Sequence, residues 1–157
     1  MTPIATIGYE GATVDGFLDA LRDAGVELLV DVRAVASSRR PGFAKSRLAA
    51  NLAGAGIEYL HLRGLGTPAD GRAAARAGRH AEMRAVYRKH LATPEAQAAL
   101  DVLAGIVRDG RPACILCFEA DPVHCHRSLV AAALAERMPL EVRHLAPLGP
   151  GVEDEDG

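Results

Sequence analysis

Five short apolar segments, separated by segments of helical pattern, constrain the fold of this 157-residue chain more than any other feature. Leu28, Leu29 and Val30 form a continuous apolar run of the kind found in parallel strands that are covered on both faces. Parallel neighbours need a crossover connection, which the intervening helices supply. The sequence therefore predicts a single-domain, three-layer α/β sandwich with a mainly parallel, Rossmann-like open sheet of about five strands. The predicted strands are residues 4–7, 27–32, 57–62, 113–118 and 140–145.

Capping residues mark the starts of two of the predicted helices. Thr13 is a good N-cap, and Thr93 with Pro94 combines a cap with proline at the first helical position. Residues 63–79 hold four Gly and one Pro and are predicted to form a long connection without a helix of its own. The predicted helices are residues 14–24, 45–53, 80–91, 94–108 and about 126–137.

Length and composition exclude several protein classes. We expect one domain over residues 1–148, followed by a flexible acidic tail over 149–157. No apolar run reaches the roughly 20 residues that span a bilayer, and the N-terminus lacks the pattern of a signal peptide, so no membrane association is expected. Three cysteines are too few, and odd in number, for a disulfide-stapled secreted scaffold, which predicts a cytoplasmic protein.

Positive charge is concentrated in the middle of the chain. The formal net charge is only −2, but Arg33 to Lys89 carries twelve Arg or Lys and three acidic residues. The planar arginine fork suits phosphate and carboxylate, so this segment indicates an anionic partner, either a small molecule or nucleotide or a nucleic acid. Alternatively, the arginines solvate helix faces, an interpretation that applies best to Arg72, Arg76, Arg79, Arg84 and Arg88. The absence of Trp and the 4% aromatic content argue against a stacking platform for single-stranded nucleic acid.

The segment from Cys117 to Ser128 has the highest density of potentially reactive side chains. It lies between a predicted buried strand and the start of a predicted helix. Free N–H groups at a helix N-terminus attract anions and lower the pKa of a thiol. We therefore expect Cys117 or Cys125 to act as a nucleophile with His126 as its proton partner. Two alternatives remain: the cysteines are buried structural residues, or they bind zinc together with histidine.

Zinc is the less favoured of these interpretations, because the eight-residue spacing matches no tight zinc knuckle. Cys114 and Cys117 do spell C-x-x-C, but residues three apart on a strand face opposite sides of the sheet. No metal ligand is therefore predicted.

Carboxyl ends of parallel strands meet at one edge of a sheet, which is where ligands bind in open α/β folds. Asp31 and Arg33 follow the second predicted strand and share one face, either as a ligand-positioning pair or as a structural salt bridge. The predicted catalytic residues are Cys117, Cys125, His126 and Asp31. The predicted ligand-binding residues are Gly8, Tyr9, Arg33, Arg39, Arg127 and Ser128.

Four short motifs follow one another along the chain. They are Thr6–Glu10, Leu29–Arg33, Ile57–Leu62 leading to Gly66, and Cys117 followed by Cys125–Ser128. In this combination, over residues 4 to about 145, the chain resembles the domain of unknown function 488 family. The resemblance implies a small bacterial or archaeal α/β domain and brings with it no activity, substrate or cofactor. Its motif positions fall on Gly8, Asp31, Arg33, Arg39, Tyr59, Gly66, Cys117, Cys125, His126 and Arg127.

Tyr9 departs from the family pattern, where histidine is common. Any base or ligand role of that position would therefore differ in this chain.

Together these features predict a cytoplasmic α/β domain with a Cys/His/Arg pocket at the carboxyl edge of its sheet. The pocket is expected to bind a phosphate- or nucleotide-like anion, with thiol-based catalysis as its candidate chemistry. The alternatives are a nucleic-acid-binding module that uses the basic middle segment and a structural domain stabilised by zinc. Neither a cofactor nor an oligomeric state follows from the sequence.

Overall fold

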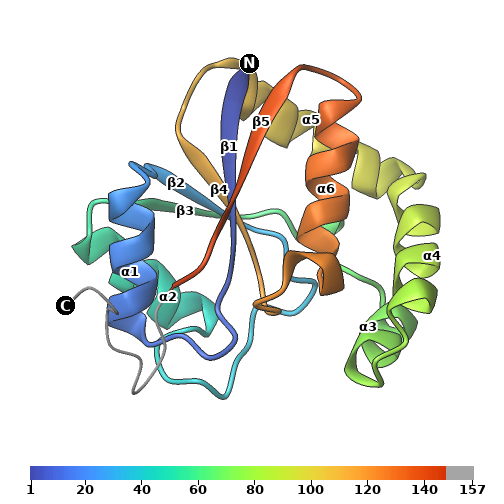
Figure 1. The fold of residues 1–157 in the computed structure, drawn as a ribbon, viewed down its shortest axis with the longest axis horizontal. Coiled ribbons are helices and arrows are strands. Elements are labelled where there is room, and N and C mark those ends of the chain that lie inside the picture. The colour runs from blue at the N-terminus through green and yellow to red at the C-terminus, as the bar shows by residue number, and fades with distance from the viewer. Residues whose placement is uncertain (148–157) are drawn as a thin grey trace.

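The computed structural model describes residues 1–147, so the predicted acidic tail lies outside the described residues. The strands are β1 (Thr2–Gly8), β2 (Leu28–Asp31), β3 (Glu58–His61), β4 (Ala113–Cys117) and β5 (Leu140–Leu145). They form one five-stranded sheet in the order β3-β2-β4-β1-β5, in which every pairing is parallel (Figure 1). The predicted open, parallel α/β sheet is confirmed.

Helices cover both faces of this sheet (Figure 1). One face carries α1 (Val14–Asp23) and α2 (Lys45–Gly54). The other carries α5 (Pro94–Arg108) and α6 (His126–Ala135), with α4 (His80–Leu91) packed beside them. Within the described part of the chain, no helix is both long and apolar enough to cross a membrane. The cytoplasmic location and the domain boundary at residue 148 stay predictions.

Successive side chains of β4 point to opposite faces of the sheet, so Cys114 and Cys117 lie in opposite layers, as predicted. Cys114 packs in the core beneath α1 and α2, together with Leu116. Cys117 packs with Ile115 in the core beneath α5 and α6. Since α6 begins directly after Cys125, Cys117 and Cys125 lie in the same layer.

The predicted helix-free connection over residues 63–79 is wrong, because it contains helix α3 (Ala69–Arg76) after a single turn of 3-10 helix, η1 (Arg63–Leu65). The glycine content of this segment was interpreted as a sign of a loop, but Gly71 is required by helix packing. Gly71 is buried inside α3, where an added Cβ would lie 2.5 Å from Thr67 Cγ2 and 3.1 Å from Val86 Cγ1 of α4. Glycine therefore permits the close approach of α3 and α4.

Candidate functional site

A cavity of about 310 Å³ opens where β1, β2 and β4 end. Tyr9 and Arg33 enter its wall from the loops after β1 and β2, and Phe118 and Glu119 enter it from the loop after β4. Helix α3 closes another side. The remaining polar lining consists of Ser37, Thr67, Arg72, Arg76, His124 and His126. This is the sheet edge at which the sequence predicts a ligand site.

Arg33 is held by a buried network. Its Nε and Nη2 donate to the two carboxylate oxygens of Asp31 at 2.8–3.1 Å, and its Nη1 donates to the Phe43 carbonyl at 2.8 Å. The Tyr59 hydroxyl donates to Asp31 Oδ2 at 2.6 Å. Burial disfavours the charge on Arg33, but Asp31 and Tyr9 together outweigh that effect and raise the pKa of Arg33 above its ordinary value. Asp31 therefore lies behind the cavity wall and orients Arg33, which reaches the cavity with its charge already balanced.

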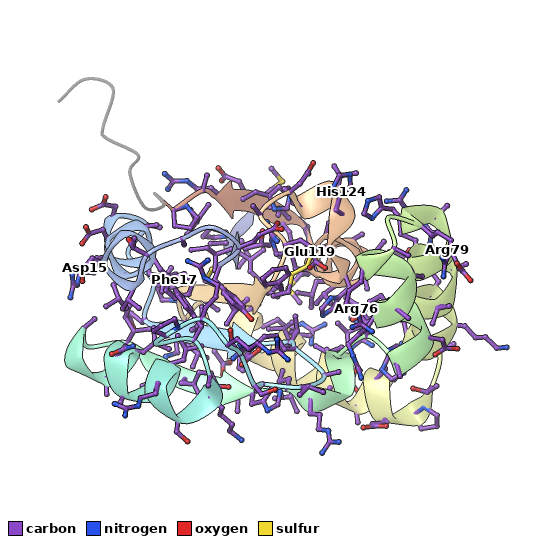
Figure 2. The ribbon with its side chains drawn as sticks, turned by 90° about the horizontal axis from the view of Figure 1, so that it is seen from below. Asp15, Phe17, Arg76, Arg79, Glu119 and His124 are labelled. Carbon is purple, nitrogen blue, oxygen red and sulfur yellow. A yellow bond between two sulfur atoms is a disulfide. The ribbon has the colours of Figure 1, made fainter. Side chains whose placement is uncertain are left out.

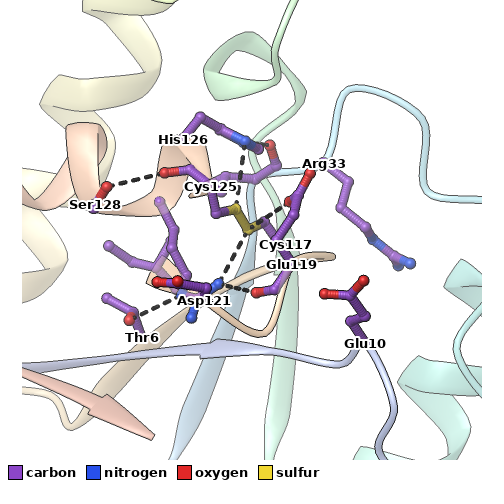
Figure 3. The surroundings of a disulfide bond; sticks show 12 residues. Thr6, Glu10, Arg33, Cys117, Glu119, Asp121, Cys125, His126 and Ser128 are labelled. Carbon is purple, nitrogen blue, oxygen red and sulfur yellow. Dashed lines mark hydrogen bonds between the residues drawn. A yellow bond between two sulfur atoms is a disulfide. The ribbon is translucent and has the colours of Figure 1, made fainter. Parts of the chain in front are cut away.

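The sulfur atoms of Cys117 and Cys125 meet beneath the cavity and form a disulfide (Figure 3). The sequence did not predict this pairing. A turn brings Cys125 back over the end of β4: Asp121 Oδ1 accepts a bond from Val123 N at 3.0 Å and caps the single 3-10 turn η2 (Pro122–His124). Cys125 is then the extended N-cap residue of α6. Both cysteines are buried and neither lines the cavity, so the pair lies behind the cavity wall.

His126 connects this pair to the cavity. It lines the cavity, and its Nδ1 lies 3.9 Å from Cys125 Sγ. Its Nε2 lies 2.7 Å from the Val32 carbonyl oxygen, which can only accept, so Nε2 carries the proton and Nδ1 keeps a free lone pair. Burial lowers the pKa of His126 to about 4, so the ring is neutral at pH 7.

Arg127 is buried and binds the loop that follows β4. Its Nη1 contacts Cys117 Sγ at 3.5 Å and donates to the Glu119 carbonyl, and its Nη2 donates to the Ala120 carbonyl at 3.1 Å. Its Nε donates to Thr6 Oγ1 at 3.1 Å. Within residues 1–147, no carboxylate forms an ion pair with this guanidinium. Burial lowers the pKa of Arg127 from its ordinary value, and nearby acidic groups, among them Glu119 and Asp121, oppose that shift.

Glu119 is the acidic group on the cavity side of the pair. Its Oε2 lies 3.7 Å from Cys117 Sγ. Burial raises the pKa of Glu119, and the nearby Arg127 opposes that shift. The remaining cysteine, Cys114, is free and buried in the other layer, where burial raises the pKa of its thiol. Cys117, Cys125 and His126 are the group that could hold a metal ion, since their ligand atoms lie within 4.8 Å of one another.

The predicted residues thus fall into three groups. Tyr9, Arg33 and His126 line the cavity. Others lie directly behind its wall or support the turn that forms it: Gly8, Asp31, Cys117, Cys125, Arg127 and Ser128, whose Oγ donates to the Cys125 carbonyl. Arg39 is exposed and outside the cavity.

Arg72 and Arg76 also line the cavity, although sequence reasoning favoured a solvated helix face for them. The arginines from Arg72 to Arg88 recur every three to five residues, which indicated one solvated helix face and the segment that leads into it, but helix α3 itself was not predicted.

Comparison with known proteins identifies the family of the chain. A family model described as domain of unknown function DUF488 matches residues 13–134, which include β2, α3 and the complete Cys117–Arg127 segment. No curated protein and no solved structure matches the chain.

Proposed function

The chain belongs to the DUF488 family, and we propose that it binds a small anionic thiol or disulfide in the cavity and exchanges electrons with it through Cys117 and Cys125. The observation that carries this proposal is the position of His126, which lines the cavity and contacts the cysteine pair. A ligand in the cavity is therefore one side chain away from a sulfur atom.

The anionic character of the ligand follows from α3. Arg72 donates one hydrogen bond, to the Thr67 carbonyl at 2.9 Å, and its other N–H groups make no further bond within residues 1–147. Arg76 lies one helical turn further along, on the same side. Unlike Arg33, neither is paired with a carboxylate among residues 1–147. The two guanidinium groups suit a phosphate or a carboxylate.

The exchange proceeds by two displacements. A substrate thiolate attacks Cys125 Sγ, the sulfur–sulfur bond of the protein breaks, and Cys117 leaves as a thiolate beside Arg127 Nη1. A second substrate thiolate attacks the substrate sulfur of the mixed disulfide and releases Cys125. Two substrate thiols become one disulfide, the protein gains two electrons, and the two thiol protons pass to the protein sulfurs or to solvent. The reverse sequence reduces a substrate disulfide.

Phosphate is the simplest probe of the anion site. We expect millimolar phosphate to raise the melting temperature, since a ligand that binds only the folded state stabilises it by about 2.7 kcal/mol at 100 times its Kd. Arg76→Ala should abolish most of the increase. Arg79→Ala is the matched control, because Arg79 is exposed, pairs with Glu82 and does not line the cavity (Figure 2). Equal increases in both variants would place phosphate elsewhere.

Thiol exchange is tested with two reductants of different charge. We expect mercaptosuccinate, which carries two carboxylates, to reduce the Cys117–Cys125 disulfide at least tenfold faster than neutral mercaptoethanol at equal thiolate concentration. That ratio corresponds to about 1.4 kcal/mol of transition-state binding. Alkylation and peptide mass spectrometry follow each cysteine, with buried Cys114 as the internal reference. The double variant of Arg72→Ala and Arg76→Ala should equalise the two rates. Equal rates in the unaltered protein would contradict the proposed function.

A further inference from the structure

We propose that in the reduced protein Cys117 Sγ, Cys125 Sγ and His126 Nδ1 bind a divalent zinc ion, with Glu119 Oε2 as the fourth ligand. Thiolate and imidazole are the ligands that zinc prefers in proteins, and carboxylate oxygen is the third common type. Zinc binding requires only the reduced cysteines and does not depend on the proposed exchange activity.

The ligand atoms of Cys117, Cys125 and His126 lie within 4.8 Å of one another, and Glu119 completes a tetrahedron when its side chain turns toward them. With Zn–S bonds of about 2.3 Å and Zn–N or Zn–O bonds of about 2.0 Å, neighbouring ligand atoms lie about 3.3–3.8 Å apart. Cys125 Sγ and His126 Nδ1 are 3.9 Å apart, and Cys117 Sγ and Glu119 Oε2 are 3.7 Å apart. Two edges of the tetrahedron are therefore already close to the required length.

The backbone positions of the cysteines also suit a shared ion. Their Cα atoms are 7.1 Å apart. Most disulfides have Cα separations of about 4.4–6.8 Å. A metal ion holds two sulfurs about 3.8 Å apart, so the same backbone accepts the ion when the side chains rotate away from each other.

The hydrogen bond of His126 Nε2 orients the ring so that Nδ1 can bind a metal ion. Metal-binding histidines usually donate the other ring N–H to a carbonyl or carboxylate, which fixes the tautomer and the ring orientation. His126 Nε2 makes this contact with the Val32 carbonyl at 2.7 Å. The Nδ1 lone pair is therefore left free, 3.9 Å from Cys125 Sγ.

Charge balance explains why Arg127 is buried beside these groups. Zinc with two thiolates and one carboxylate carries a net charge of −1 by formal valence. The Arg127 guanidinium, which contacts Cys117 Sγ at 3.5 Å and lacks a carboxylate partner within the described range, supplies the matching positive charge. The ion and its surroundings are then neutral as a group, which reduces the cost of burying them.

Glu119 gives the ion access to the cavity. It lines the cavity and is the only one of the four ligands from an exposed loop segment, whereas both cysteines are buried. A zinc site open to a ligand commonly has three fixed protein ligands and one exchangeable position. Glu119 occupies the exchangeable position, so an anion held by Arg72 and Arg76 would compete with it.

The test uses the full chain, reduced with a phosphine and kept free of oxygen. Zinc is titrated against a chromophoric chelator, and cobalt(II) serves as a spectroscopic probe. We expect one ion per chain and an intense thiolate-to-cobalt charge-transfer absorption. Cys125→Ser should weaken zinc binding by more than the 10–100-fold that is typical of outer-shell partners. Cys114→Ser is the matched control and should bind as the unaltered protein does, because Cys114 lies in the other layer.

The cobalt spectrum of the unaltered protein keeps the test decisive even if a cysteine variant fails to fold. A reduced protein that binds no zinc at micromolar concentration, or that binds cobalt without the charge-transfer absorption, overturns the inference. So does zinc binding that survives substitution of both Cys117 and Cys125. The exchange assay is run on chelator-treated protein, so its failure is separate from a failure of zinc binding.

Discussion

Replacing Asp31 by Asn is expected to lower the free energy of unfolding by about 3–5 kcal/mol, the loss typical of breaking a buried ion pair. Asp31 is fully buried and accepts bonds from the Arg33 guanidinium and the Tyr59 hydroxyl. Asparagine keeps the size of the side chain but removes its charge, which leaves Arg33 charged and buried without a counter-ion. Urea denaturation at pH 7 measures the loss.

An exposed ion pair provides the control. Asp101 pairs with Arg137 on the surface, where the Asp101 side chain is 69% exposed. Asp101→Asn makes the same chemical change and should cost less than about 1 kcal/mol. If the two variants lost equal stability, the Asp31–Arg33 pair would not have the structural importance that its burial indicates.

Gly8→Ala is expected to destabilise the protein by about 3 kcal/mol, at the upper end of the cost usual for overpacking. A Cβ at Gly8 would overlap the backbone carbonyl of Glu119 and lie 2.8 Å from Arg127 Nη1. Backbone cannot move aside as a flexible side chain can. The loop that carries Glu119 would therefore shift, and phosphate binding should weaken together with thermal stability.

Gly105→Ala is the matched substitution. Gly105 lies inside α5, and a Cβ there would meet nothing within 4 Å. Alanine is a better helix former than glycine by about 1 kcal/mol, so this variant should be slightly more stable. Differential scanning calorimetry compares the two. A Gly8→Ala protein as stable as the Gly105→Ala protein would contradict the close packing of β1 against the Glu119 loop.

Much of the fold could be predicted from local pattern. The central strands β2 and β4 were recognisable because they are apolar on both faces, and α1 and α5 because Thr13 and Thr93 cap them. Helix α3 was missed because glycine usually indicates a loop. Gly71 instead lies inside the helix, where the close approach of α3 and α4 leaves no room for a side chain. This constraint depends on tertiary packing, which no local pattern contains.

The sequence predicted many of the residues of the candidate site, but not how they are arranged. Strand order brings Asp31, Cys117 and Arg127 to one sheet edge, which the topology rules anticipate. Which arginines are neutralised depends on burial and on which partners the fold brings within reach. Arg33 is paired with Asp31, and Arg127 binds loop carbonyls, whereas Arg72 and Arg76 of the missed helix line the cavity and have no carboxylate partner among residues 1–147.

The strand order also dictates how the chain can fold during synthesis. Strand β1 is the first to be synthesised, but its two neighbours are β4 and β5, with Ala5 beside Cys114 and Thr2 beside Leu140. Pairing over more than a hundred residues is entropically slow, and β1 has no partner until those strands have left the ribosome. Because Gly8 at the end of β1 packs against the Glu119 loop, the nascent chain assembles its cavity among the final steps of folding.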